Sequence, residues 1–552
     1  MKSAARSALE SAAPFLASLL LLLAFLAQQT SQRAVVDPDS ARHLRRVELA
    51  LSASRTPQVD RFAAHPEGAP LVEPPLFDTV WALAARALLG EGAGGAGRAP
   101  DEARLERALA QVGPLSLVVL AGLVYVAARR FQPGGRRAPA LVAMLVVATS
   151  PTLAEQTLAG RLSVGPTLAV LTALALLLVR SAVSAREPLD RLLAGLVVGL
   201  VTGIGLAVSP LFAGPALAVW ATLLRSAWAR APAERPLAVR TGLLFSIAAV
   251  AIGLSPLFDG PWQAAPAGPV AEWARQVGVG GVAGCVPFVL AGLPWATRLP
   301  GARVADLSTL AALVALGWAR AAHLDLELSS ASAVLGAWPL AFVIAVLPGA
   351  EVGGSPGLRS CLRLAGVVTL IGALADPVGV ASFGVVAALT AGALPFALDQ
   401  PRLLRRAGAV LVVGGIAVGV AGIAERATRP QAARIELVQS LRWLRDHSTA
   451  PGPWNAADAR QAWAVGCSAE IAPLVHYHAR RPSVTLVGEA RDHGLTPAAA
   501  ARTAGIRYLV LEGDATPPGD GFEELRPAGA YTLWGLVAET SPSTGARATP
   551  AD

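Results

Sequence analysis

Residues 37–90 read DPDSARHLRRVELALSASRTPQVDRFAAHPEGAPLVEPPLFDTVWALAARALLG, and they stand between one apolar run and a long apolar body. Two carboxylates, Asp37 and Asp39, flank Pro38 directly after the first apolar run. Because proline disfavours helix for the residue before it, we expect both on irregular backbone at a membrane edge. Converging carboxylates suit a hard cation such as Mg²⁺ or Mn²⁺. The alternative is a turn and an N-cap for a helix that starts near Ser40.

Composition places most of the chain in lipid. The 552 residues are 54% hydrophobic, with a mean hydropathy of +0.52. The net charge of +8 comes almost wholly from arginine, and in a polytopic protein such an excess is an orientation signal rather than a sign of nucleic-acid binding. Cys285, Cys361 and Cys467 show neither a disulfide framework nor a zinc spacing.

Apolar segments predict about thirteen membrane-spanning helices. Residues 13–28 form the first, which we interpret as uncleaved, and Lys2 and Arg6 before it place the N-terminus in the cytoplasm. Residues 75–89 are too short to span, so we expect a helix at the interface. A flexible polar link with a short helix follows. The further spans are expected near 111–128, 138–153, 164–180, 191–207, 209–225, 241–257, 280–297, 304–321, 332–348, 362–375, 379–397 and 404–424.

The loop charges and the C-terminal composition complete the expected architecture. Arginine-rich loops alternate along the spans and fall on the side of the N-terminus, which predicts an external, periplasmic or extracellular, C-terminus. From about residue 425, a helix and the short runs RPSVTLVGEA, GIRYLVLEG and YTLWGLVAE predict a small α/β domain, with a helix in TPAAAARTAG. The expected parts are a first helix (1–30), an external loop (31–110), a multi-span domain (111–424) and an external domain (425–552).

The spacing of several landmarks resembles a known family. These are Asp39-x-x-x-His43-Leu44-Arg45-Arg46, Pro57-Gln58-x-Asp60, His65-Pro66-Glu67-Gly68 and Pro74-Pro75-Leu76-Phe77-Asp78. They resemble the first external loop of oligosaccharyltransferase catalytic subunits, which have the type-C glycosyltransferase fold. The resemblance implies glycan transfer from a polyprenyl-phosphate-linked donor. It also implies that Asp37 or Asp39 helps to hold a metal and touches the acceptor.

Two further external loops are compared with the family's acidic motifs. In the second loop Leu162-Ser163-Val164 stands where the family has carboxylates, and Glu155 and Arg161 are the nearby charges. They complete the site or form a solvated pair. In residues 258–279, Glu272 resembles the family's glutamate at the acceptor. The alternative there is an amphipathic helix with tryptophan at the headgroup level.

The C-terminal part matches the family's flanking motifs and departs between them. Trp443-Leu444-Arg445 and Tyr477-His478-Ala479-Arg480-Arg481-Pro482 match, whereas Ser468-Ala469-Glu470-Ile471-Ala472 replaces the aromatic motif that recognises the acceptor hydroxyl. Ala375-Asp376-Pro377 stands where the family often has a phosphate-binding arginine. His476 and His478 would share one face of a strand, as a metal pair or as solvated or core-edge side chains.

Together these features predict a membrane glycosyltransferase similar to oligosaccharyltransferase. Its catalytic residues would be Asp37, Asp39 and Glu272, its metal ligands Asp37, Asp39 and Glu155, and its substrate-binding residues His43, Arg46, Arg161 and Glu470. The expected partners are a polyprenyl-linked glycan, a protein or other acceptor and the lipid membrane. Because of the departures, we expect no transfer to an Asn-x-Thr peptide. The alternatives are a non-catalytic protein that binds polyprenyl lipid or a partner, and a transporter.

Overall fold

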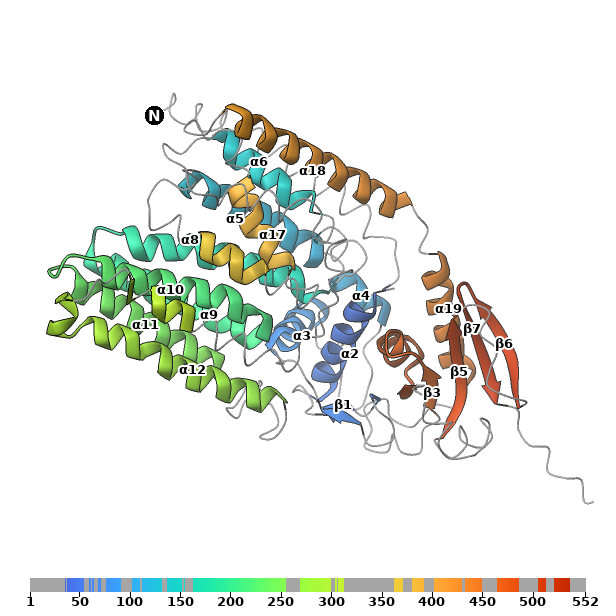
Figure 1. The fold of residues 1–552 in the computed structure, drawn as a ribbon. Helices are drawn as coiled ribbons and strands as arrows, with labels where there is room; N and C mark the ends of the chain where they lie inside the picture. The colour runs from blue at the N-terminus through green and yellow to red at the C-terminus, as the bar shows by residue number, and fades with distance from the viewer. Residues whose placement is uncertain are drawn as a thin grey trace, which may run out of the picture. The chain divides into compact units, whose positions relative to one another are not determined.

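The chain folds into two compact units, which are residues 1–58 with 70–430, and residues 59–69 with 431–552 (Figure 1). The computed structural model describes residues 35, 37–53, 59–60, 62–63, 68–70, 76–90, 102–109, 112–131, 137–150, 153, 162–254, 269–298, 303–304, 306–311, 362–370, 380–391, 402–428, 432–448, 464–485, 505–512 and 521–536.

The first unit is helical, and its long helices follow the apolar segments of the sequence (Figure 1). Five helices of the described part, those that contain α5, α8, α9, α11 and α12, are long and apolar enough to cross a membrane. The expected segments at 13–28 and 332–348 lie outside the described residues. The long helices are α5 (Val112–Phe131), α6 (Arg137–Ala148), α8 (Val164–Ser184), α9 (Pro188–Val208), α10 (Ala213–Ala229), α11 (Arg235–Gly253), α12 (Pro269–Ala291), α17 (Val380–Ala391) and α18 (Arg402–Thr428).

A stripe of glycines lets α9 and α11 approach closely. Gly195, Gly199 and Gly203 recur every four residues and therefore lie on one face of α9. A Cβ atom built on Gly199 would lie 2.5 Å from the carbonyl oxygen of Phe245, so no larger residue fits without movement. Small residues at this spacing are a general means of bringing membrane helices into contact, because hydrophobic burial gives little drive between helices in lipid.

Three shorter helices of the first unit carry most of the polar residues of interest. The helix α2 (Pro38–Ala53) packs against α3 (Leu76–Leu89), and α4 (Glu102–Leu109) follows. The bounds of α3 match the expected interfacial helix at 75–89, and α4 is the short helix expected in the polar link.

The second unit contains a mixed five-stranded sheet and the helix α19 (Ala432–His447). The strands β4 and β5 both run parallel to β3, while β7 is antiparallel to β5 and to β6. Ala464, Ile506 and Leu509 are buried at its centre. In spatial order the strands are β4 (Ser483–Thr485), β3 (Ala464–Cys467), β5 (Ile506–Glu512), β7 (Tyr531–Leu536) and β6 (Phe522–Ala528).

The sheet agrees with the sequence in three strands and differs elsewhere. The runs expected to be strands contain β4, β5 and β7, whereas β3 and β6 were not expected. The expectation that His476 and His478 lie on a strand is wrong, because both lie on the π-helical turn η9 (Val475–Ala479). That turn continues α20 (Ala472–Leu474) and stops at Arg480, which has a left-handed backbone. The helix expected in TPAAAARTAG lies almost wholly outside the described residues.

Candidate functional site

Asp37 is the N-cap of α2. Its Oδ2 accepts a hydrogen bond of 2.8 Å from the Ser40 amide, and its carbonyl accepts one of 3.0 Å from the Ala41 amide. Pro38 takes the first helical position, where a missing N–H loses no intrahelical bond. The structure therefore confirms the capping alternative for Asp37. The expectation of irregular backbone is wrong for Asp39, which lies in the first turn of α2 because proline restricts the residue before it rather than the one after.

A chain of charged side chains joins α2 to α3 inside the first unit. His43 Nδ1 lies 2.7 Å from Asp78 Oδ1, so the ring donates its N–H to the carboxylate. On the opposite edge of the ring, His43 Nε2 lies 3.7 Å from Asp39 Oδ1. Arg46 Nη1 lies 3.6 Å from Asp78 Oδ2. Asp39, His43 and Arg46 share one face of α2, since steps of four and three residues each make about one turn.

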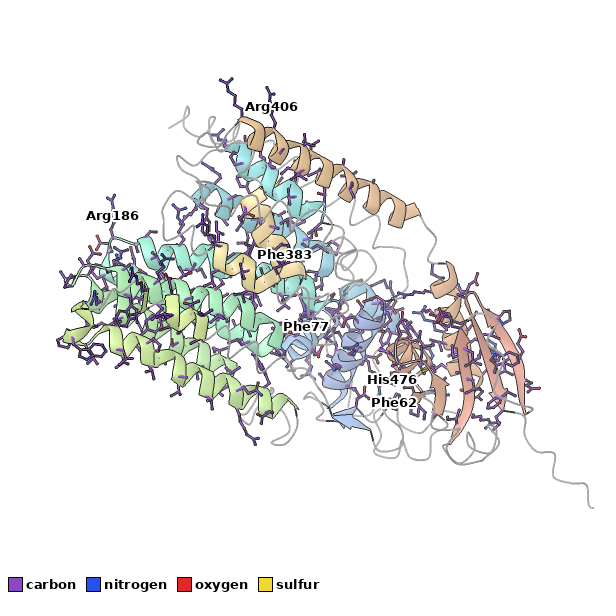
Figure 2. All side chains as sticks on the ribbon, viewed as in Figure 1. Phe62, Phe77, Arg186, Phe383, Arg406 and His476 are labelled. Atoms are coloured by element: carbon purple, nitrogen blue, oxygen red, sulfur yellow. The ribbon has the colours of Figure 1, made fainter. Side chains whose placement is uncertain are left out.

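Exposure differs within this group. The side chains of His43 and Asp78 are 2% and 1% exposed, whereas the Asp39 side chain is 32% exposed. The Phe77 ring (labelled in Figure 2) packs against the His43 ring, with centroids 4.9 Å apart and planes at 71°. Buried charges persist where they are paired, and Asp78 has both His43 and Arg46 beside it. Of the four charged side chains, Asp39 is thus the carboxylate that solvent reaches.

The sequence had assigned this group only in part. His43 and Arg46 were expected to bind substrate, whereas their described polar contacts are with acidic side chains. Asp78 was noticed as a landmark of the loop but not as a site residue. Its signal was a lone carboxylate at the start of an apolar helix, which also fits an ordinary helix start.

The beginning of α2 is joined to the second predicted motif loop. The amide of Leu162 donates to Ser40 Oγ at 3.4 Å, and both residues are buried. The structure therefore brings together the segment with Asp37 and Asp39 and the place where the family's second acidic motif would stand. Glu155 and Arg161 lie outside the described residues.

Glu272 lies on the first turn of α12 and is exposed. Its described partners belong to the same helix, with Arg275 Nη1 3.6 Å away and Gln276 Nε2 3.4 Å away. The neighbouring Trp273 donates its indole N–H to the Leu206 carbonyl of α9 at 3.0 Å, which anchors this turn against the helices. No contact between Glu272 and α2 is described.

Of the predicted cation ligands, the structure describes Asp37 and Asp39, whereas Glu155 lies outside the described residues. Asp37 caps α2, and Asp39 has Arg42 and His43 beside it. Asp37, Asp39 and Glu272 do not form a described group of three ligand atoms within 4.8 Å. The three-residue ligand set of Asp37, Asp39 and Glu155 therefore stays a prediction, and no chemical step is derived from a cation.

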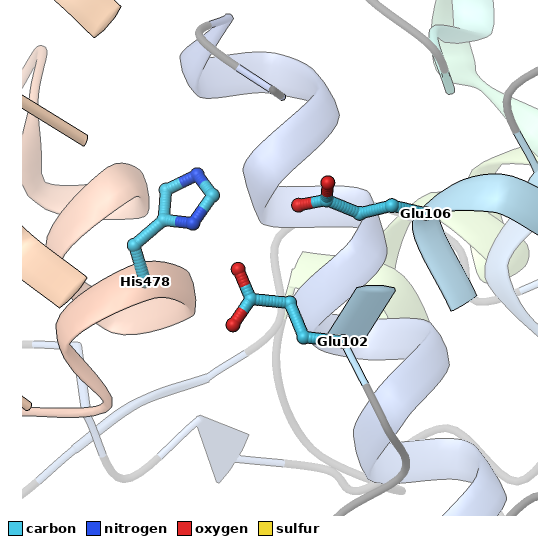
Figure 3. A group of neighbouring side chains, drawn as sticks. All are labelled: Glu102, Glu106 and His478. Atoms are coloured by element: carbon cyan, nitrogen blue, oxygen red, sulfur yellow. The ribbon is translucent and has the colours of Figure 1, made fainter. Parts of the chain in front are cut away.

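Sequence reasoning also passed over two buried carboxylates on α4. Glu102 and Glu106 lie one turn apart on this helix, and both are less than 9% exposed (Figure 3). The i, i+4 spacing was visible in DEARLERA, but such spacing is common on solvated helices.

The second unit contains the site residues that the sequence predicted in the C-terminal part of the chain. Glu470, expected to bind substrate, is exposed and accepts a hydrogen bond of 3.0 Å from Arg434 Nη2. His476 Nε2 lies 2.7 Å from Ser483 Oγ, and the Phe62 ring of the loop segment 59–69 packs 6.4 Å from the His476 ring (Figure 2). Phe62 also accepts a hydrogen bond from the Ser483 amide at 2.9 Å.

A buried thiol belongs to the same cluster as His476 and Ser483, and these three residues form the second group. Cys467 is fully buried at the end of β3. Burial raises the pKa of the Cys467 thiol from an ordinary 9.0 to about 12, although a hydrogen bond with Ser483 opposes the rise. A thiol is a nucleophile only as the thiolate. This group is therefore built for packing rather than for attack on a substrate.

No protein-family model and no curated protein sequence matches the chain. Solved structures do match. The oligosaccharyltransferase from Archaeoglobus fulgidus in complex with Zn and sulfate is 13% identical, and the match covers 89% of this chain and 68% of that one with a TM-score of 0.62. Archaeal oligosaccharyltransferase AglB from the same organism, in complex with an inhibitory peptide and a dolichol-phosphate, is 12% identical, and the match covers 95% of this chain and 75% of that one with a TM-score of 0.62. ArnT from Cupriavidus metallidurans bound to undecaprenyl phosphate is 14% identical, and the match covers 96% of this chain and 99% of that one with a TM-score of 0.45.

The two oligosaccharyltransferase structures establish the fold class. The chain has the type-C glycosyltransferase fold of archaeal oligosaccharyltransferase, as the landmarks of the first loop indicated. That fold and the five apolar helices of the described part indicate an integral membrane protein.

Proposed function

We propose that the chain is a membrane glycosyltransferase that moves a glycan from a polyprenyl-phosphate-linked donor to an acceptor outside the cytoplasm. The observation that carries the proposal is the oligosaccharyltransferase fold over 89% of the chain. The dolichol-phosphate and inhibitory peptide bound to the archaeal enzyme support a lipid-linked donor and a peptide-like or other acceptor for this fold.

Asp39 is the proposed catalytic carboxylate. The acceptor's N–H or O–H group would donate a hydrogen bond to it. The acceptor atom attacks the anomeric carbon, the bond from that carbon to the phosphate oxygen breaks, and the electron pair leaves with the phosphate. The acceptor's proton passes to Asp39. A single displacement of this kind inverts the anomeric configuration, and a positioned base typically contributes about 10²- to 10⁴-fold.

The remaining predicted site residues keep supporting roles in the proposal. Glu272 would position the acceptor, and Arg161 and Glu470 would contact substrate. A divalent cation, Mg²⁺ or Mn²⁺, would involve Glu155 beside Asp39. Mn²⁺ titration of the reconstituted protein checks this, because a ligand role requires weaker binding in both E155Q and D39N than in the unchanged protein.

The acceptor is proposed to differ from an asparagine sequon. Ala469 and Ala472 stand in the stretch that corresponds to the family's hydroxyl-recognising motif, and alanine offers no side-chain hydrogen bond. A site that recognises a hydroxyl discriminates strongly because its own polar groups would otherwise stay unpaired. We therefore expect no transfer to an Asn-x-Thr peptide, and sequon-dependent glycosylation that D39N abolishes would contradict this expectation.

The orientation is proposed from the charges of the loops. Arginine-rich loops on the side of the N-terminus support a cytoplasmic N-terminus and an external C-terminal unit. Reporter fusions after residue 430 should behave as exported. A cytoplasmic signal there would remove the argument for an external site.

The proposed function is tested with the full chain in lipid nanodiscs. A polyprenyl-linked radiolabelled glycan is supplied with a panel of peptide, lipid-phosphate and saccharide acceptors. We expect the label to move to one acceptor class and the movement to be lost in D39N. Donor that stays intact with the whole panel would reject the transferase and favour the lipid-binding alternative.

A further inference from the structure

We infer that His43 is a positioning residue that holds the carboxylate of Asp39, with Asp78 and Phe77 fixing the His43 ring. The inference rests on the proposed function, because it assigns the orientation of the proposed catalytic carboxylate to a buried histidine. It concerns how the site is built rather than which acceptor it uses.

The His43 ring is fixed from two directions. Its Nδ1–H group donates to Asp78 at 2.7 Å, and its edge packs against Phe77 at a centroid distance of 4.9 Å. Both partners belong to α3, so the ring of an α2 residue is held by the neighbouring helix. Rotation about χ2 would break the hydrogen bond and leave a buried carboxylate without its donor, which is costly.

The support for Asp78 extends one step further. Its Oδ2 lies 3.6 Å from Arg46 Nη1, so each of its carboxylate oxygens has a different cationic or donating neighbour. The hydrogen bond at Oδ1 and the nearby positive charge at Oδ2 favour one orientation of the Asp78 carboxylate, and the hydrogen bond passes that orientation to the His43 ring. Protein sites use supporting contacts of this kind to keep a reacting group in its productive orientation.

The second ring nitrogen faces Asp39. His43 Nε2 lies 3.7 Å from Asp39 Oδ1, just beyond hydrogen-bond reach. Because Nδ1 already carries the proton that Asp78 accepts, Nε2 can hold a carboxylate only as a second N–H, so the positioning form of His43 is the imidazolium. Catalytic contacts are often long without substrate and tighten when it binds. Asp39 is also 3.9 Å from Arg42, whose side chain is 42% exposed and therefore gives little orientation. The buried ring is the stiffer of the two neighbours.

A second charge pair on the same helix provides a matched comparison. Arg45 Nη1 lies 3.7 Å from Glu48 Oε2, and both side chains are almost fully buried. By helical spacing this pair lies on the face of α2 opposite to His43. It shares the burial of the His43 group, and its described ion pair joins Arg45 and Glu48 to each other rather than to Asp39. E48Q therefore controls for the loss of a buried charge in α2.

Two amide variants of His43 distinguish the contact made by Nδ1 from the contact made by Nε2. An asparagine amide reaches about as far as Nδ1 and a glutamine amide about as far as Nε2. H43N should keep a donor for Asp78 and lose the reach to Asp39, whereas H43Q should keep that reach. We expect H43N to lower kcat between about 10- and 10²-fold with the acceptor KM unchanged, as for a misplaced catalytic group. H43Q should recover part of this loss, because it regains the reach to Asp39 but leaves Asp78 without its Nδ1–H donor.

The kinetic outcomes decide the inference as follows. E48Q should match or exceed the loss of thermal stability in H43N while kcat stays at the level of the unchanged protein. An unchanged kcat in H43N, or an equal fall in E48Q, would overturn the positioning role and leave His43 as a structural residue.

A spectroscopic test does not require turnover. The chain contains seven histidines, so ¹⁵N-histidine labelling gives a small set of ring signals, and those missing in H43N belong to His43. We expect D78N to shift the Nδ1 signal and D39N to shift the Nε2 signal. An Nε2 signal that D39N leaves in place would overturn the inference. If the shift occurs and no acceptor is glycosylated, the proposed function fails while the positioning role stands.

Discussion

Two buried histidines, His43 and His476, belong to hydrogen-bonded groups that differ in solvent access. His43 lies between the carboxylates of Asp78 and Asp39, and the latter is partly open to solvent. His476 bonds to Ser483, which also bonds to the fully buried Cys467 thiol. Both groups cross between elements that are distant in the sequence. The difference shows that a cluster of reactive residue types marks a candidate site only where one member remains accessible.

The physical reason is the cost of forming charge without water. A buried thiol resists ionisation, so the pKa of Cys467 rises to about 12 and the group stays neutral. A half-exposed carboxylate such as Asp39 keeps water on one side and a fixed partner on the other. It can therefore be charged and oriented at once, as proton transfer requires.

The largest expected effect of a substitution is on glycan transfer, through the group of Asp39, His43, Arg46 and Asp78. D39N replaces the proposed base by an amide that cannot accept a proton. We expect kcat to fall by about 10²- to 10⁴-fold with little change in folding. Initial rates with the lipid-linked donor measure it, and E48Q is the control. A fall below about threefold would remove Asp39 from the chemistry.

The second prediction concerns the reactivity of Cys467. With its pKa near 12 rather than 9.0, the folded thiol should have about 10³-fold less thiolate at a given pH. Alkylation at pH 8 in a C285A/C361A background should be at least that much slower than in denaturant. Rapid labelling of the folded protein would contradict the buried setting.

The pKa shift also gives a direction for the pH dependence of stability. The thiol loses its proton less readily in the folded state than in the unfolded state. Its contribution is therefore fully present below pH 9 and is lost as the pH rises from 9 toward 12. C467A should weaken this alkaline loss when unfolding is followed across that range.

The third prediction is a moderate loss of stability in the second group. S483A removes the hydroxyl that pairs with both His476 and Cys467. A buried polar group left unsatisfied costs about 1–3 kcal/mol. Unfolding of the second unit, followed by Cys467 labelling in increasing denaturant, measures the change. Transfer by the folded protein should stay unchanged, and a matching fall in kcat would give this group a catalytic part.

The smallest expected effect is that of E272Q on stability. Glu272 is exposed, and its described partners lie on its own helix, so we expect a change within about 0.5 kcal/mol. Thermal unfolding checks this. The same variant tests the acceptor role proposed for Glu272, because that role requires a fall in transfer that remains smaller than in D39N.

The sequence predicted several of the long helices in the first unit. The expected segments at 164–180 and 191–207 correspond to α8 and α9, because a continuous apolar run specifies a membrane helix from local composition alone. The helix α3 and the strands β5 and β7 were predicted for the same kind of local reason. The family landmarks indicated the fold class that the comparisons establish.

The candidate site was predicted less completely, since its contacts join distant segments. The carboxylates of Asp37 and Asp39 were identified as a pair. In the structure Asp37 caps α2, whereas Asp39 lies beside His43. The choice between a cap and a ligand depends on which backbone amides lie within reach, and residue spacing alone does not determine it.

The sequence by itself determined which parts of this protein are apolar enough for lipid, roughly where several long helices lie, and which family its first loop resembles. Only the tertiary structure decided that Asp78 supports His43 and that Phe62 of the first loop packs on His476 of the C-terminal unit. The reason is that secondary structure follows from side chains a few residues apart, whereas burial and hydrogen-bond partners follow from segments that meet only after folding.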